Sequence, residues 1–72
     1  MMVYAKVNGI DVKLFHGAKL KHALLKADER FYYSVVKHGS TIRDQEGNHV
    51  DIMGAVDKGF CYTVDPVLDR ET

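Results

Sequence analysis

Residues 3–15 read VYAKVNGIDVKLF, two runs of alternating apolar and polar residues on either side of an Asn8-Gly9 pair. Asn-Gly is the pair that most readily takes the positive φ angles of a two-residue type I′ turn. Such a turn fixes the register, with Val7 opposite Ile10 and the apolar residues paired on one side. Because the alternation and the turn agree on one register, the sequence predicts a β-hairpin with one apolar face.

A helix is predicted directly after the hairpin. Gly17 ends the second strand, and from about Lys19 the apolar residues recur at helical spacing. One stripe of this helix is apolar and consists of Leu20, Ala23, Leu24 and Ala27. The opposite side is basic and consists of Lys19, His22, Lys26 and Arg30.

Residues 28–39 are compatible with two structures. Phe31, Tyr32, Val35 and Val36 fit a short second helix with Asp28 as its N-cap and Gly39 just past its end. The same residues also favour strands, and His38-Gly39 could form a hairpin turn. The pattern favours the helix, and the strand remains the alternative.

Three short strands are expected in the second half of the chain. Residues 41–44 and 49–52 flank a turn at 45–48, and a turn at 57–59 leads into a strand over 60–64. The side chains of this last strand that should face the core are Phe60, Tyr62 and Val64. Pro66 should end the strand. The order of elements predicts an α+β domain of the β-grasp type over residues 1–65. It would have a mixed sheet of four or five strands and one main helix on one face, followed by a tail at 66–72.

Two segments carry a family resemblance. VYAKVNGIDVKLFHGAKLKHALL (residues 3–25) resembles the opening of the ubiquitin-like sulfur carriers of thiamin and molybdopterin synthesis, where a VNG hairpin precedes a Gly-containing turn and an amphipathic helix. GAVDKGFCYTV (residues 54–64) is similar to their closing segment. The resemblance implies a β-grasp fold. Those carriers end in a Gly-Gly whose carboxylate is adenylated, whereas the last glycine here is Gly59, so we expect no carrier chemistry.

Several kinds of chemistry lack the residues they need. A single cysteine, Cys61, permits no intramolecular disulfide, no multi-thiolate zinc site and no ferredoxin-type cluster. The four histidines show no HxxxH or HxH spacing; they are His16, His22, His38 and His49. We therefore expect no metal, no cofactor and no enzymatic activity. The opening MMVYAKVNG lacks the features of a signal peptide, and no apolar run approaches about 20 residues, so we expect a cytoplasmic protein without membrane contact.

Charge is balanced overall but not along the chain. Residues 1–43 carry eight Lys and Arg against three acids, and residues 44–72 carry two against seven. The two halves can neutralise each other when they fold side by side. An isoelectric point near 6.9 argues against a nucleic-acid partner for the basic helix side.

The face of the hairpin away from the helix is the candidate site. The register puts Met2, Tyr4 and Phe15 there, and Cys61 and Thr63 join them if the last strand lies beside the first. Several apolar side chains clustered on an exposed sheet face mark a partner site. We therefore predict a non-enzymatic module that binds another protein, or a second copy of itself, through this open sheet face.

Three alternatives stay open at this point. The tail, with Val67 and Leu68, could fold back over the open sheet face and cover it. The chain could instead be a small-solute-binding β-grasp domain, because those share the strand, Gly turn and helix opening. It could also be a sulfur-carrier-like protein with a divergent C-terminus.

Overall fold

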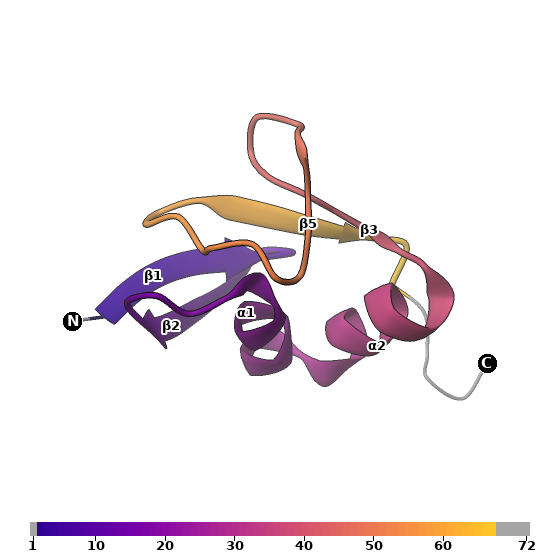
Figure 1. Ribbon diagram of the computed structural model, residues 1–72, viewed down its shortest axis with the longest axis horizontal. Coiled ribbons are helices and arrows are strands. Elements are labelled where there is room, and N and C mark those ends of the chain that lie inside the picture. The colour runs from indigo at the N-terminus through magenta and orange to yellow at the C-terminus, as the bar shows by residue number, and fades with distance from the viewer. Residues whose placement is uncertain (1, 68–72) are drawn as a thin grey trace.

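A five-stranded sheet with both helices on one side forms the structure, a computed structural model that describes residues 2–67 (Figure 1). The elements are β1 (Met2–Val7), β2 (Ile10–Phe15), α1 (Leu20–Ala27), α2 (Glu29–His38), β3 (Thr41–Arg43), β4 (His49–Val50) and β5 (Cys61–Asp65). The strand order is β2-β1-β5-β3-β4, with β1 and β5 parallel and the other pairs antiparallel. The chain is therefore an α+β protein with a mixed sheet, as predicted.

The N-terminal hairpin has the predicted register. Its pairs run from Met2 opposite Phe15 to Val7 opposite Ile10. Asn8 and Gly9 both have positive φ, at 50° and 82°. Two successive residues with positive φ are what a type I′ turn requires, so the local sequence alone determines how β1 and β2 pair.

Asn8 also connects the hairpin to β5. Its backbone N–H donates to the Tyr62 carbonyl at 2.9 Å. Its side-chain Oδ1 accepts from the Val64 N–H at 2.8 Å, and its Nδ2 donates to the Val64 carbonyl at 3.3 Å. The amide therefore takes the place of a further peptide group and continues the parallel β1–β5 pairing past the end of β1.

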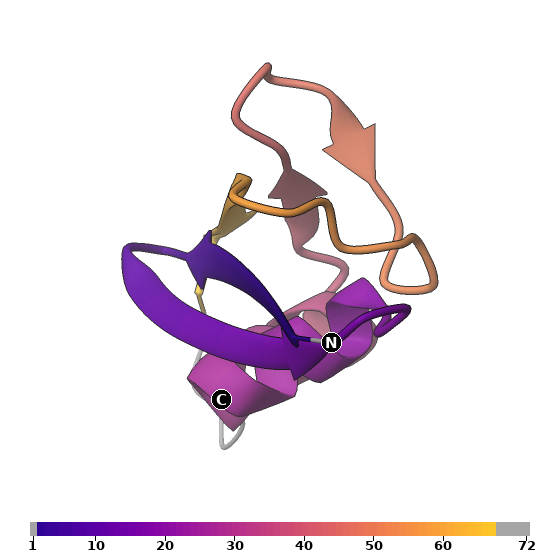
Figure 2. The same ribbon diagram turned by 90° about the vertical axis from the view of Figure 1, so that its left-hand side faces the viewer.

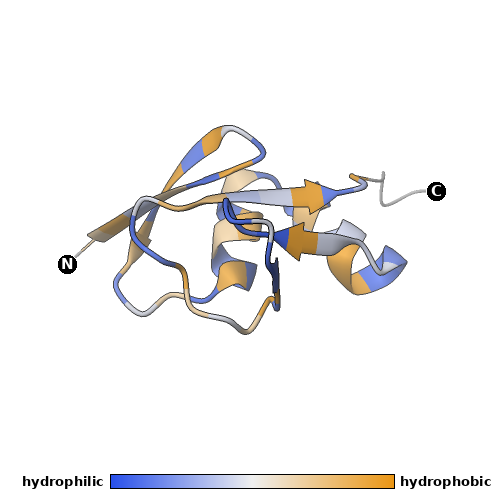
Figure 3. Cartoon of the chain, turned by 90° about the horizontal axis from the view of Figure 1, so that it is seen from above, coloured by the Kyte–Doolittle hydropathy of each residue, from blue (hydrophilic) through white to orange (hydrophobic). Residues whose placement is uncertain are grey.

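The core lies between the sheet and the two helices. The alternation of apolar and polar residues along the strands, visible in Figure 3, turns every second side chain toward the helices. The fully or almost fully buried apolar residues are Val3, Ala5, Val7, Val12, Leu14, Leu20, Ala23, Leu24, Phe31, Ile42, Tyr62 and Val64. Three of the four predicted stripe residues of α1 are in this set, and the fourth, Ala27, is half-buried against it.

Residues 29–38 form the second helix, as the pattern favoured, and Asp28 and Gly39 are its caps. The Asp28 carboxylate accepts from the Arg30 N–H at 3.0 Å and so caps the N-terminus of α2. Gly39 ends the helix in the left-handed region, at φ 71°. Hydrogen bonds from the Arg30 side chain and backbone hold the pKa of the Asp28 carboxyl below its usual value.

The basic side of the first helix is shorter than expected. α1 ends at Ala27, so Arg30 belongs to α2, where its guanidinium pairs with the Asp28 carboxylate at 2.7 Å. The expectation that Arg30 continues the basic side of α1 is wrong, because Asp28 both ends one helix and begins the next. Lys19, His22 and Lys26 remain exposed at or along α1.

The segment after β4 packs on the start of α1. Its carbonyls at Gly54 and Ile52 accept from the Leu20 and Lys21 N–H groups, both at 2.9 Å. These bonds satisfy backbone donors that the first turn of a helix leaves free. They also explain why β4 covers only His49–Val50 and not 49–52: the Ile52 carbonyl is used by the helix and not by the sheet.

Replacing Asn8 with glycine tests the bond to β5. Asn8→Gly still permits positive φ but removes both side-chain hydrogen bonds to Val64, so it should lower the free energy of unfolding by about 1–2 kcal/mol. Asn48→Gly is the matched control, because Asn48 lies in the β3–β4 turn and bonds to Asp44 through its backbone N–H. Urea unfolding of both variants measures the difference. Equal losses in the two variants would show that the Asn8 amide contributes nothing beyond the turn.

Candidate functional site: an exposed apolar cluster on the open sheet face

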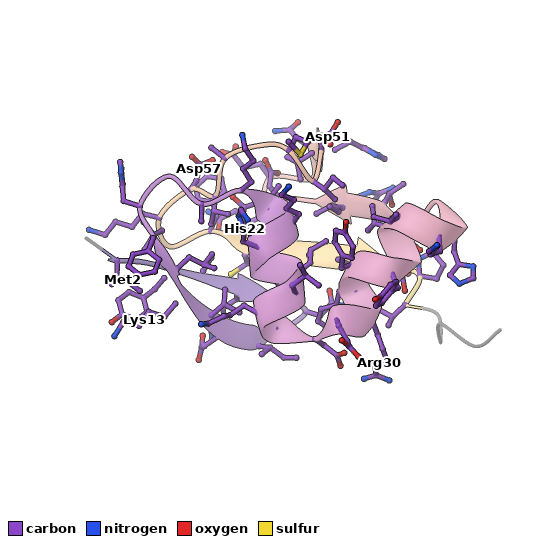
Figure 4. The ribbon with its side chains drawn as sticks, turned by 60° about the horizontal axis from the view of Figure 1, so that its bottom comes forward. Met2, Lys13, His22, Arg30, Asp51 and Asp57 are labelled. Carbon is purple, nitrogen blue, oxygen red and sulfur yellow. The ribbon has the colours of Figure 1, made fainter. Side chains whose placement is uncertain are left out.

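Three apolar side chains gather on the sheet face opposite the helices. Tyr4 is 57% exposed and Phe15 is 75% exposed, and Met2 is half-buried between solvent and the sheet. Met2 lies directly opposite Phe15, and Tyr4 lies opposite Lys13, the neighbour of Phe15 on the same face. Figure 4 shows Met2 and Lys13 at the same end of the hairpin. We call Met2, Tyr4 and Phe15 the open-face cluster.

Charged side chains border this cluster. The Lys13 ammonium lies 5.9 Å from the centre of the Tyr4 ring, which is a cation–π distance. Lys6 and Asp11 form an exposed ion pair at 3.6 Å, of a kind that contributes about 0–1 kcal/mol. The rings are thus bordered by charged side chains of both signs, which resembles the apolar centre and polar rim of a protein interface.

Cys61 lies next to the open-face cluster. β5 runs beside β1, as the candidate site required, with Cys61 level with Lys6. A shallow hollow of about 120 Å³ separates Cys61 from Tyr4. The Gly59 N–H donates to the Tyr4 carbonyl at 2.7 Å and holds the chain there before β5 begins. The Cys61 thiol is free and exposed.

Thr63 lies away from the cluster. The parallel register that pairs Lys6 with Cys61 puts Thr63 level with Asn8, and Thr63 pairs on its other side with Arg43. Four residues separate Tyr4 from Asn8, which is about 13 Å along a strand. The structure therefore brings Met2, Tyr4 and Phe15 together, places Cys61 at their border and leaves Thr63 at the other end of the same face.

The tail alternative can be followed as far as Val67. β5 continues past the end of β1 and away from Met2, so Pro66 and Val67 lie at the far end of the sheet from the cluster (Figure 1). The Ser40 hydroxyl donates to the Pro66 carbonyl at 2.7 Å and holds this end beside α2. Val67 does not cover the cluster, and Leu68 lies outside the described residues.

Tyr62 supports the chain beside the cluster from inside the core. Its side chain is 2% exposed, and its phenol oxygen accepts from the Asp57 N–H at 2.9 Å. This bond fixes the 57–59 turn, which in turn positions Gly59 against Tyr4. Burial of the phenol raises the pKa of Tyr62 above its usual 10.0.

A groove between β2 and α1 is a feature that the sequence interpretation missed. It has a volume of about 620 Å³ and reaches from the strand edge to the helix surface. Leu25, 45% exposed, is part of its wall. The available signal was that Leu25 is apolar yet lies outside the buried stripe of the helix.

Potential metal ligands are dispersed over the described part of the chain. Among residues 2–67, no three His, Cys, Asp or Glu side chains lie close enough together to hold a metal ion. No helix in that range has the length and apolar composition needed to cross a membrane. What the arrangement presents to solvent is apolar and aromatic surface, which can bind by contact.

Comparison with known proteins identifies no relative. No protein-family model, no curated protein and no solved structure matches the chain. The function therefore has to be inferred from the surfaces of the molecule itself.

Tyr62→Phe tests the support beneath the cluster. The variant keeps the buried ring but leaves the Asp57 N–H without its acceptor, so it should cost about 0.5–1.5 kcal/mol at pH 7. Because burial raises the folded-state pKa, the contribution of the phenol is complete below pH 10 and is lost as the pH rises further. The stability difference between wild type and variant should therefore shrink above pH 10.

Urea unfolding between pH 7 and pH 11 measures this difference. Tyr4→Phe is the control, because the Tyr4 phenol is exposed and its removal should leave stability almost unchanged. A difference for Tyr62→Phe that stays constant across the whole pH range would contradict the assignment.

Proposed function

We propose that this chain is a β-grasp domain that acts without catalysis, by binding another protein through the open-face cluster of Met2, Tyr4 and Phe15. The observation that carries the proposal is the pair of exposed rings, 57% for Tyr4 and 75% for Phe15, on a sheet face that neither helix covers (Figure 2). Aromatic residues are enriched among the side chains that dominate binding energy at protein interfaces.

The order of strands supports the β-grasp assignment. A hairpin followed by a helix, with the last strand parallel to the first in the centre of the sheet, is the arrangement of β-grasp domains. It also agrees with the resemblance of residues 3–25 and 54–64 to the ubiquitin-like sulfur carriers. A shared fold supports an architecture and not an activity, so the binding proposal is based on the surface alone.

The shape of the face favours a protein over a small solute. The hollow between Tyr4 and Cys61 on this face holds about 120 Å³, whereas small-molecule sites enclose roughly 300–1,000 Å³. The larger groove of about 620 Å³ lies between β2 and α1 and reaches only Met2 and Phe15 of the cluster. A nearly flat surface with two protruding rings suits a partner that is itself broad. An aromatic side chain buries about 150–250 Å² when it is covered, so the two rings would supply the centre of an interface of ordinary size.

Replacing Tyr4 and Phe15 together with serine tests the proposal. Neither ring points toward the helices, so the double variant should lose only the cross-strand contacts, roughly 0.2–1 kcal/mol each. Capture of a partner from a lysate, or self-association in sedimentation, should fall at least about tenfold because the aromatic anchors are gone. Thermal melts of the same samples establish that the domain remains folded.

Two control variants show whether a loss of binding comes from the open-face cluster or from unfolding. Val36→Ser removes an exposed apolar residue from α2, on the helical side of the molecule, and should leave binding unchanged. Leu24→Ser removes a fully buried side chain and should unfold the domain. If the Tyr4/Phe15 variant stays folded and still binds all that the wild type binds, the open-face cluster is not the binding surface.

A further inference from the structure

The outer edge of β2 is open for pairing with another strand. β2 lies at one end of the strand order, with β1 as its neighbour among the described residues. In an antiparallel pair, residues that exchange hydrogen bonds alternate with residues whose backbone groups point away. The turn bond makes Val7 and Ile10 an exchanging pair. The backbone groups of Asp11, Lys13 and Phe15 therefore point away from β1.

Hydrogen bonds on the other side of β1 support this parity. The Lys6 N–H donates to the Phe60 carbonyl, and the Tyr4 carbonyl accepts from the Gly59 N–H, so both groups point away from β2. Lys6 and Tyr4 are the partners of Asp11 and Lys13. The strand contains no proline, and within residues 2–67 only the Phe15 carbonyl of this outer edge is used, by the Ala18 N–H at 3.0 Å. Such an edge is a template for an added strand.

The groove between β2 and α1 adjoins this edge. Leu14, Phe15, Ala18 and Leu25 give it an apolar lining, within a volume of about 620 Å³. The side chains of a strand added at β2 would alternate, with every second one turned to the helix side of the sheet. Those side chains would enter the groove, so the groove favours apolar residues at every second position of the added strand.

The rim of the groove is basic. Lys13, His16, His22 and Lys26 line it, and no Asp or Glu does. Figure 4 shows Lys13 on the hairpin and His22 on α1. An apolar strand that also carries carboxylates would therefore meet opposite charge on both sides, and complementary charge steers association and selects partners.

A second copy of this chain fits the edge less well than a single extended segment. Two copies joined antiparallel through β2 would form one continuous sheet with both α1 helices on the same side. Because α1 packs beneath β2 and β1, the second α1 would compete for the space of the groove. It would also bring Lys26 toward its own counterpart, where like charges repel. A lone segment brings no helix.

We propose that the free edge of β2 and the adjoining groove bind an extended segment of a partner protein in which apolar residues alternate with Asp or Glu. The segment adds a sixth strand next to β2, where the backbone groups of Asp11 and Lys13 pair with it. Its apolar side chains fill the groove, and its carboxylates lie beside Lys13 and along the basic rim. The inference rests on the proposed function only in taking a protein as the ligand, because this surface shares just Met2 and Phe15 with the open-face cluster.

A designed peptide serves as the probe. The ¹⁵N-labelled chain is titrated with acetylated and amidated Glu-Val-Glu-Val-Glu-Val-Glu, and the amide shifts are followed by NMR. We expect saturable shifts at Asp11, Lys13 and Phe15 and around Leu25 on α1. The peptides with Lys in place of Glu, or with Ser in place of Val, should bind at least about tenfold more weakly, because they lose the charge match or the apolar contact.

Two substitutions at one position separate backbone from charge. Lys13→Pro removes an outward N–H and no bond within the sheet, so it should weaken peptide binding at least about tenfold. Lys13→Gln keeps the N–H and loses one exposed charge, so the expected loss is about two- to fivefold. Leu25→Glu places a carboxylate in the groove wall and should also abolish binding. Leu25→Glu tests the groove independently if the Lys13→Pro variant does not fold.

The open-face cluster supplies the last control. Tyr4→Ser should leave peptide binding unchanged, because Tyr4 belongs to the open-face cluster and not to the groove. Failure of the peptide-binding proposal can therefore be distinguished from failure of the open-face proposal. The inference is overturned if the shifts fall outside β2 and α1, if the Lys peptide binds as well as the Glu peptide, or if Leu25→Glu binds normally. It is also overturned, in favour of a second copy, if sedimentation shows a dimer that Lys13→Pro abolishes.

Discussion

The turn at Asn8-Gly9 is the constraint on which the remaining structure depends. Positive φ at both residues sets the pairing of β1 with β2, and the Asn8 amide binds both backbone groups of Val64. The same residue thus determines where β5 lies, and β3 and then β4 pair onto β5. A shift of one residue at this turn would move the apolar side chains of β2 from the helix side to solvent. The core therefore forms only in this register.

The register of the hairpin also determines both candidate binding surfaces, the open-face cluster and the free edge of β2. Because Val12 and Leu14 face the helices, Lys13 and Phe15 must face the opposite side. Because Ile10, Val12 and Leu14 exchange hydrogen bonds with β1, the backbone groups between them must point outward. The exposed rings and the free edge are therefore two consequences of one register, and a substitution that alters the turn would disturb both.

Interactions within a few residues of each other could be predicted from the sequence, and those between distant segments could not. The hairpin register, the buried stripe of α1 and the cap at Asp28 all depend on neighbours in the chain. The register between β5 and β1 depends on two hydrogen bonds, from the Lys6 N–H to the Phe60 carbonyl and from the Asn8 N–H to the Tyr62 carbonyl. Each bond joins residues more than fifty positions apart in the sequence. Alternation predicts the face on which Thr63 lies but not its position along the strand, which is why it was grouped with Tyr4. The groove was missed for the same reason, since it forms only where α1 meets an edge.

Phe15 lies where the two candidate surfaces meet. Its ring is on the open face, its N–H points outward at the edge of β2, and its carbonyl accepts from Ala18 at the start of the connection to α1. A strand added beside β2 would turn every second side chain toward the open face, next to Lys13 and the Phe15 ring. A partner that pairs with the edge would thereby cover part of the open-face cluster as well. The high exposure of Phe15 follows from its position, because no strand formed by residues 2–67 lies beyond β2 to cover its ring. The proposed partner segment would supply one.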